Sequence, residues 1–299
     1  MKILFVTATR IGDAVLSTGL LGHLVETRPG ARITVAKRRM SLHWPLLWAK
    51  VAPHAWDLVV DLRGSALPWL VITRERRTLV AGGERLHKVA QLARVLGLDP
   101  PPAPRLWTRP EDEREAAALV PPGAPFLCIG PSANWRGKQW RGERFAELAR
   151  RLTRPGGLLP GARVVVMAAA HERAQAEPVI AALPESGRID LVGKIGLLTA
   201  AAILRRAALF VGNDTGLMHI AAAAGAPTLA LFGPTQVGTY GPWGPRAAVA
   251  HTPLPAEALY GPGFDHRTTD TMMDTLTLDA VEAAAAELLT RLGVSAAAG

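Results

Sequence analysis

Cysteine is almost absent from the sequence. The 299 residues include one, Cys128, so neither a disulfide nor a cysteine-based metal site can form within one chain. This usage is typical of a reducing compartment. No apolar run reaches the roughly 18 residues of a membrane span, because Gly, Pro or a charge interrupts each long tract. The apolar run at residues 3–6 is too short for a signal peptide and indicates a first strand.

Several motifs of nucleotide and metal chemistry are missing as well. No G-x-G-x-x-G occurs after an apolar strand, and the stretch from Gly130 to Lys138 lacks the spacing of a Walker A loop. No Asp-x-Asp pair occurs, and His171-Glu172 has no second histidine at the spacing of a zinc motif. The ordinary dinucleotide fingerprint is therefore absent, and a metal-dependent transferase is disfavoured. We expect no metal and no cofactor.

Positive charge is concentrated in the first part of the chain. Residues 1–110 hold 17 Lys and Arg against 7 Asp and Glu, whereas the remainder holds 17 against 18. Such asymmetry favours an anionic partner, namely a phosphorylated glycolipid, a membrane surface or nucleic acid. A basic surface without a partner is the alternative. The densest cluster, after a predicted strand at 32–36, is Lys37, Arg38 and Arg39, and we expect it to contact an anionic acceptor.

One stretch in the second half has the pattern of a strand, a helix and a second strand. An apolar run at 209–211 is followed from Thr215 by Ala-rich helix formers, and Gly225 with Pro227 ends the helix before a run at 228–232. Strands joined in this way are parallel, and parallel sheets bind ligands at the carboxyl ends of their strands. That edge would hold Asp214, Thr215 and Gly216, with His219 one helical turn further on.

A helix N-terminus at this edge suits a phosphate, because its first N–H groups lack partners within the helix. Two interpretations remain open from the spacing alone. Either Asp214 and His219 face a ligand, or Asp214 caps the helix and His219 is simply buried. Asp214 or Thr215 is the predicted N-cap.

A similar unit opens the chain. A strand at 2–8 is followed by a loop containing Asp13 and a helical pattern at 14–24, and residues 57–65 contain a further strand that ends in a polar turn with Arg63. A carboxylate at this edge can take the proton from a hydroxyl that attacks a sugar carbon. The alternative role for Asp13 is a helix N-cap.

A proline run at 99–104 divides the sequence. It can form neither a helix nor a central strand, so it indicates a stiff connector that a short helix at 111–119 extends. The apolar pattern restarts at 126–130. The sequence therefore predicts two domains, residues 1–120 and 121–299.

Further polar side chains follow the strands of the second half. The loop after the strand at 126–130 carries Ser132 and Lys138, and Lys194 follows a short apolar strand. A lysine at such a strand end can neutralise a departing diphosphate. The alternative is that both lysines are solvated surface charges. Beyond residue 235 the sequence is rich in loop signals, up to a predicted final helix at 276–292.

The run 212–219, Gly-Asn-Asp-Thr-Gly-Leu-Met-His, resembles the C-terminal signature of glycosyltransferase family 9, as does Gly-Ala-Pro-Thr at 225–228. Gly12-Asp13 is similar to the N-terminal signature of that family, which contains the lipopolysaccharide heptosyltransferases. Three further positions match the family by order and spacing: Ser132, Lys138 and Lys194.

The resemblance implies a GT-B fold, in which two Rossmann-like α/β domains face a central cleft, and an inverting, metal-independent transfer. It implies a nucleotide-sugar donor, with ADP-heptose favoured, and a lipopolysaccharide core or similar anionic glycolipid as acceptor. The final helix often crosses back to the first domain in such folds. We expect a cytoplasmic protein and leave peripheral contact with the inner membrane open.

The resemblance also implies roles for individual residues. Asp13 would be the catalytic base, and Lys194 would stabilise the leaving diphosphate. The expected donor-binding residues are Ser132, Lys138, Asp214, Thr215, Gly216 and His219. For the acceptor we expect Lys37, Arg38, Arg39 and Arg63, because they are basic and lie in the first domain.

Two other functions stay open from the sequence. A nucleotide-sugar epimerase of the same fold is disfavoured because no additional acid and base groups stand out. A non-catalytic nucleotide-sugar or glycolipid binding protein would keep every biochemical property in Asp13→Ala, whereas an enzyme would keep donor binding and lose turnover. We expect no nucleic-acid partner, because the basic and aromatic residues form no binding motif of that kind.

Overall fold

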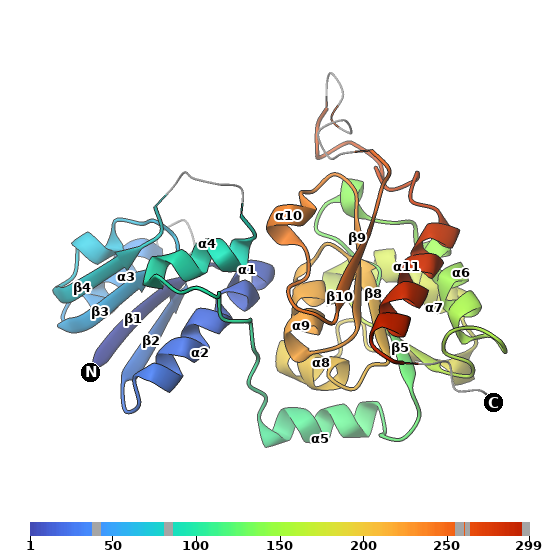
Figure 1. Cartoon of the computed structure of the whole chain (residues 1–299), viewed down its shortest axis with the longest axis horizontal. Helices are drawn as coiled ribbons and strands as arrows, with labels where there is room; N and C mark the ends of the chain where they lie inside the picture. The colour runs from blue at the N-terminus through green and yellow to red at the C-terminus, as the bar shows by residue number, and fades with distance from the viewer. Residues whose placement is uncertain (38–42, 81–85, 255–259, 261–263, 295–299) are drawn as a thin grey trace. The chain divides into compact units, whose positions relative to one another are not determined.

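The computed structural model describes residues 1–37, 43–80, 86–254, 260 and 264–294 (Figure 1). The chain divides into two compact units, Met1–Arg105 and Leu106–Gly299. Each unit contains one all-parallel sheet flanked by helices, which confirms the predicted α/β class with two parallel-sheet domains. Within the described residues, no helix has the length and apolar character needed to cross a membrane.

The first unit has four strands in the order β2-β1-β3-β4. The side chains of its inner strands β1 and β3 are buried on both faces of the sheet, as is usual for a parallel sheet. The strands are β1 (Lys2–Thr7), β2 (Arg32–Lys37), β3 (Trp56–Asp61) and β4 (Thr73–Thr78). The helices are α1 (Ile11–Leu16), α2 (Thr18–Thr27), α3 (His43–Val51) and α4 (Lys88–Ala93).

The second unit has six strands in the order β10-β9-β8-β5-β6-β7. The strands are β5 (Phe126–Gly130), β6 (Arg163–Val166), β7 (Arg188–Asp190), β8 (Leu209–Asn213), β9 (Thr228–Phe232) and β10 (Ala247–His251). The helices are α5 (Pro110–Leu119), α6 (Gly142–Thr153), α7 (Arg173–Ala182), α8 (Leu197–Leu204), α9 (Gly216–Ala224), α10 (Val237–Tyr240) and α11 (Leu278–Arg291).

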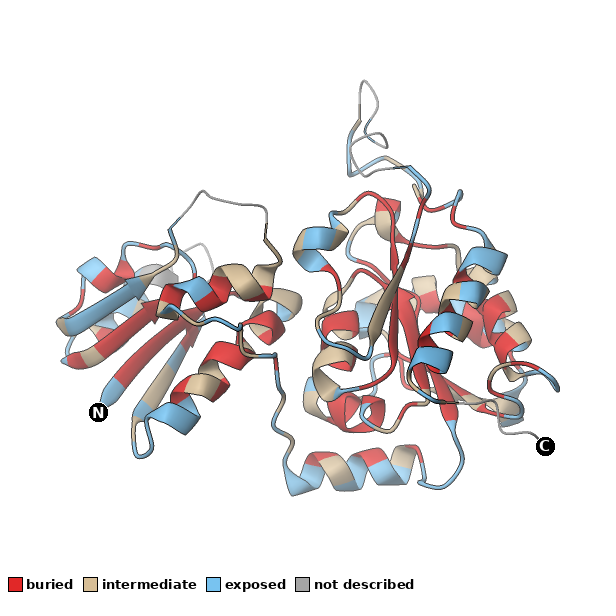
Figure 2. Ribbon diagram, viewed as in Figure 1, coloured by how far each residue is buried: buried red, intermediate tan, exposed pale blue. Residues whose placement is uncertain are grey.

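A continuous apolar core holds this second sheet together. Leu127, Ile129 and Leu231 from the strands share one cluster with Phe145 of α6 and Leu288 of α11, all at most 1% exposed. Figure 2 shows the inner strands β5, β8 and β9 buried along their length. The sheet is therefore a rigid base on which the loops at its carboxyl edge rest.

The stretch at 236–275, predicted to be rich in loops, also contains a short helix and a strand that the sequence did not predict. The chain forms α10 there, and β10 pairs in parallel with β9, with Ala248 opposite Leu229. Alanine has a low preference for strands, so the local pattern gave no signal. Pairing with an adjacent buried strand overrides that preference.

Candidate functional site

In each sheet, candidate site residues follow a strand at which the strand order reverses. In the second sheet β6 lies on one side of β5 and β8 on the other, which is the arrangement that opens a ligand-binding crevice beyond the carboxyl ends of the strands. The loop after β5 carries Ser132 and Lys138, and the turn after β8 carries Asp214. The topology thus brings the predicted donor residues of these two segments side by side.

Asn213, the last residue of β8, ties the two loops together. It is 0% exposed, and its Oδ1 accepts a hydrogen bond from the backbone N–H of Trp140 at 3.1 Å. Its Nδ2 donates to the carbonyl of Pro131 at 2.8 Å and to that of Ser132 at 3.4 Å. One buried amide therefore holds both ends of the loop between β5 and α6. Sequence analysis gave Asn213 no role.

Lys138 and Asp214 form an ion pair at this edge. Nζ of Lys138 donates to the carbonyl of Asp214 at 2.9 Å and to Oδ2 at 3.1 Å. Their side chains are only 14% and 10% exposed. Solvent screens such a pair much less than it screens an exposed pair. The two residues, 76 positions apart, thus form one partly buried unit.

The helix after this pair begins as predicted at Thr215, the N-cap of α9, with Gly216 as its first residue. Asp214 does not act as a side-chain cap, because its carboxylate is paired with Lys138. In the part of the chain that the structure describes, the Thr215 side chain makes no capping hydrogen bond either. His219 is buried on α9, and its backbone N–H donates to the Thr215 carbonyl at 3.4 Å.

Ser132 contacts a residue that sequence analysis did not assign. Its hydroxyl donates to Oε2 of Glu172 at 2.8 Å, and the same oxygen accepts the N–H of Ala169 at 3.0 Å. The backbone N–H of Ala133 donates to Oε1 of Gln175 at 2.9 Å. The loop after β5 is thus joined to the segment after β6 as well as to β8.

Lys194 lies further along the same edge, after β7. Its ammonium donates to the carbonyl of Asp190 at 2.9 Å and lies 3.4 Å from Oδ2 of that residue. The side chain is 56% exposed. Burial raises the pKa of Asp190, but hydrogen bonds from Arg173 and Val192 and the charge of Lys194 outweigh it, so the pKa lies below its ordinary value. Lys194 therefore neighbours a carboxylate that stays charged.

The turn that carries Lys194 needs a glycine. Gly193 has φ +70°, and a Cβ there would come within 2.7 Å of Ala170. Its N–H donates to the carbonyl of Ala168 at 2.9 Å. The turn after β7 therefore packs closely on the segment after β6, the same segment that contacts Ser132 through Glu172.

In the first unit, Asp13 lies in the first turn of α1 and is partly buried. The interpretation of Asp13 as an N-cap is wrong, because the N-cap is Arg10. A carboxylate in a first turn is favoured by the helix dipole. Asp13 follows β1, which lies between β2 and β3, so it also sits at a strand-order reversal.

Arg63 follows β3, the neighbour of β1, and is exposed. Its backbone N–H donates to Oδ1 of the fully buried Asp61 at 2.8 Å, and the N–H and hydroxyl of Ser65 donate to Oδ2 at 2.5 and 2.7 Å. Asp61 therefore shapes this turn. Lys37 is exposed at the end of β2. The predicted acceptor residues Arg38 and Arg39 lie outside the described residues.

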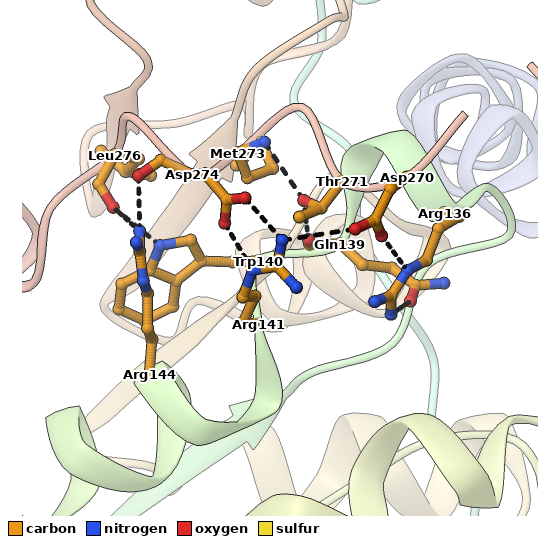
Figure 3. A network of polar contacts seen from close by, with 10 residues as sticks. All are labelled: Arg136, Gln139, Trp140, Arg141, Arg144, Asp270, Thr271, Met273, Asp274 and Leu276. Carbon is orange, nitrogen blue, oxygen red and sulfur yellow. Dashed lines mark hydrogen bonds and ion pairs between the residues drawn. The ribbon is translucent and has the colours of Figure 1, made fainter.

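Figure 3 shows a segment from Asp270 to Leu276, here called the strap, bound to the loop after β5 and the start of α6. Arg136 donates to Asp270 at 2.8 Å, and Arg141 donates to both oxygens of Asp274 at 2.6 Å and to Asp270 at 3.3 Å. The indole N–H of Trp140 donates to the Leu276 carbonyl at 2.9 Å.

Backbone contacts complete this attachment. The Met272 N–H donates to the carbonyl of Gly137, next to Lys138, at 3.0 Å. The Thr271 hydroxyl donates to the carbonyl of Gln139. Across the described ranges, no cluster of three or more His, Cys, Asp or Glu side chains is placed to hold a metal ion.

Replacing Asn213 with Ala should lower the free energy of unfolding by about 2–4 kcal/mol. The loss of its amide leaves the Pro131 carbonyl and the Trp140 N–H without a partner in a buried place. Urea denaturation measures the change. Asn134→Ala, at an exposed position of the same loop, is the matched control and should stay within about 0.5 kcal/mol of the wild type. Equal stability of the two variants would contradict the role given to Asn213.

Acid should weaken the strap. Hydrogen bonds from Thr271 and Arg136 lower the pKa of Asp270, and that of Asp274 is lowered by its hydrogen bonds with Arg141. A carboxylate with a lowered pKa in the folded state contributes stability above its unfolded pKa of about 4, and this contribution is lost as the pH falls through the folded pKa.

Arg141→Ala should therefore lower the melting temperature at pH 7 by on the order of 2–4 °C, and the difference from the wild type should shrink towards pH 3. Arg114→Ala is the control, because Arg114 is 76% exposed and its ion pair with Glu111 is long, at 3.5 Å. It should change little at either pH. If the melting temperature of Arg141→Ala differed from that of the wild type by the same amount at pH 7 and pH 3, the strap carboxylates would not be the groups that Arg141 stabilises.

Known proteins resemble this chain in sequence. Lipopolysaccharide heptosyltransferase 1 of Pseudomonas aeruginosa is 35% identical over 132 residues, which are 44% of this chain and 35% of that protein. Lipooligosaccharide heptosyltransferase 2 of Haemophilus influenzae is 33% identical over 139 residues, 45% of this chain and 38% of that protein. The matched segment thus spans little more than a third of the length of these relatives.

Solved structures match over nearly the whole length. ADP-heptose lipopolysaccharide heptosyltransferase II of E. coli has a TM-score of 0.75 and 21% identity, covering 98% of this chain and all of that one. E. coli heptosyltransferase WaaC, solved with ADP, has a TM-score of 0.71 and 19% identity. The match covers 96% of this chain and 100% of that one. The predicted GT-B fold is confirmed by these matches.

The family model described as glycosyltransferase family 9 (heptosyltransferase) matches residues 71–259, more than half of the chain. That range contains the Lys138–Asp214 pair, the Asn213 bridge and the start of α9. The family predicted from the sequence motifs is therefore confirmed, and this chain belongs to glycosyltransferase family 9.

Proposed function

We propose that the protein is an inverting glycosyltransferase that moves heptose from ADP-heptose to a lipopolysaccharide core or a similar anionic glycan acceptor. Family membership supports the reaction class. The names of the relatives, and the ADP in a solved structure of the same fold, support the donor and the acceptor. The observation that carries the proposal is the partly buried Lys138–Asp214 pair beside the N-terminus of α9.

The donor diphosphate would lie at the carboxyl edge of the second sheet. Lys138 supplies a positive charge there, and the first N–H groups of α9, at Thr215 and Gly216, supply further donors. Because Lys138 is mostly buried, the local dielectric constant is low, and this strengthens the attraction of the lysine and of the N–H groups for an anion. Asp214 orients the Lys138 ammonium, and Ser132 and His219 complete the group proposed to bind the donor.

Transfer requires a base and a stabilised leaving group. We assign the base to Asp13, whose carboxylate makes no hydrogen bond or ion pair with any described residue. It takes the proton of the acceptor hydroxyl while that oxygen bonds to the anomeric carbon from the side opposite the diphosphate. The bond from that carbon to the diphosphate breaks, and Lys138 and Lys194 stabilise the charge that develops.

Donor selectivity is the first test. Calorimetric titration with ADP, UDP, GDP and CDP should show selective binding of ADP. Lys138→Ala should weaken it about tenfold or more, because a hydrogen bond from a charged group contributes roughly 1.5–3 kcal/mol. Arg154→Ala, at an exposed position at the end of α6, is the control and should bind as the wild type does. Failure to bind any nucleotide would overturn the donor assignment.

The role of Asp13 is the second test. Asp13→Asn should keep donor affinity while transfer of heptose falls at least about 100-fold, the range lost with a general base. Transfer is measured by mass spectrometry of a lipopolysaccharide core acceptor. Glu111→Gln, which neutralises a carboxylate exposed to 63%, is the matched control and should leave the rate unchanged.

The same assay separates the alternative functions. A binding protein would hold the donor without any turnover in the wild type. An epimerase would change the sugar without an acceptor. Full transfer by Asp13→Asn would leave the reaction class intact and remove Asp13 from its proposed role.

A further inference from the structure

An apolar surface in the first unit lacks the helix that normally covers it. Parallel strands are usually joined by a crossover of a dozen or more residues that contains a helix. Here residues 62–72 join β3 to β4 through one 3₁₀ turn, Leu67–Trp69. Leu67 and Val71 pack in the core cluster that contains Val59, and Pro68 is buried as well, whereas Trp69 and Leu70 are exposed.

The second half of this connection exposes three large apolar side chains. Trp69 is 70% exposed, Leu70 48% and Ile72 71%. Trp48 of α3, itself 44% exposed, donates its indole N–H to the Leu70 carbonyl at 2.9 Å. Two tryptophans from separate segments are therefore held at one place on the surface.

Two arginines of the edge strand β4 flank these residues. The Arg76 guanidinium lies over the Trp69 ring, 5.2 Å from its centre, and its Nε donates to the Pro68 carbonyl at 2.7 Å. Arg74 projects from the same face of the strand, because side chains alternate. Figure 2 shows β4 exposed except at its two ends. We call the group the Trp48–Arg76 surface; it comprises Trp48, Trp69, Leu70, Ile72, Arg74 and Arg76.

The charges of this surface are mainly positive. Arg74 is 86% exposed and lies 3.7 Å from Asp57, whereas Arg76 makes no ion pair with a described residue. Arg77 pairs with Glu75 on the other face of the strand. Exposed aromatic and aliphatic side chains mixed with arginine are unusual on a face that meets only water. They are the composition of a surface that lies in the interfacial layer of a bilayer.

We propose that the Trp48–Arg76 surface docks the first unit on an anionic lipid bilayer. Trp69, Leu70 and Ile72 enter the boundary between headgroups and acyl chains. Arg74 and Arg76 contact lipid phosphates, to which the excess of basic residues in the first 110 positions also attracts the unit. This docking needs neither donor nor acceptor and goes beyond the proposed transfer reaction.

The test is flotation of the full chain with vesicles of phosphatidylcholine alone or with added phosphatidylglycerol. The wild type should float with the anionic vesicles only, and less at high salt. The double variant Trp69→Ser/Ile72→Ser should bind on the order of tenfold more weakly, because its apolar contact area is lost. Arg74→Ser should bind about fivefold more weakly, the effect of one basic residue at an anionic surface.

Two matched controls carry the same changes elsewhere. Trp107→Ser replaces a tryptophan exposed to 47%. Arg114→Ser replaces an arginine that is 76% exposed and pairs with Glu111 at 3.5 Å. Both should float as the wild type does, and circular dichroism should give all variants the same melting curve within a few degrees.

The proposal would be overturned if the wild type did not bind anionic vesicles. It would also be overturned if the control variants lost as much binding as the variants of the Trp48–Arg76 surface. A wild-type dimer in sedimentation that Trp69→Ser/Ile72→Ser abolishes, without vesicle binding, would assign the surface to a second copy of the chain. The vesicles contain no glycolipid and no nucleotide sugar. Their result is therefore separate from the tests of donor binding and transfer.

Discussion

The hydrogen bonds of Asn213 are the constraint on which the candidate donor site depends. A fully buried amide is costly unless each of its polar atoms finds a partner, and these partners lie at both ends of one loop. These hydrogen bonds hold both ends of that loop in place. This arrangement brings Lys138 to Asp214, although a solvated loop of this length would sample many conformations. A polar group in the core thus specifies the geometry of a charged group near the surface.

The rest of the second unit supports this arrangement from other sides. Glu172 holds Ser132 from the segment after β6, and the strap holds the far part of the same loop through Arg141 and backbone hydrogen bonds. A loop restrained in this way presents its charge without a large reorganisation when an anion arrives. Preorganised charge of that kind is the main means by which a protein stabilises a developing diphosphate. The first unit contributes a different chemistry, a carboxylate at Asp13 and a basic, apolar outer surface.

The sequence allowed much of the fold to be predicted, because the signals involved are local. A continuous apolar run predicts a buried parallel strand, and glycine or proline marks where a helix ends. The strands at 126–130 and 228–232 were predicted with the observed bounds. β10 was missed because its Ala-rich segment becomes a strand only through pairing with β9. The N-cap role of Asp13 was a wrong interpretation, because α1 begins three residues earlier than the apolar pattern indicates.

For the candidate site, the sequence by itself determined which residues match the family motif and at which end of which strand they lie. The family motif and the parallel topology are enough for that, since both follow from order along the chain. Only the tertiary structure decided that Asp214 pairs with Lys138 and that Asn213 and Glu172 hold the loop between β5 and α6. These contacts join residues 40 to 82 positions apart. No local pattern specifies such partners, because they meet only after the sheet has brought its strand ends to one edge.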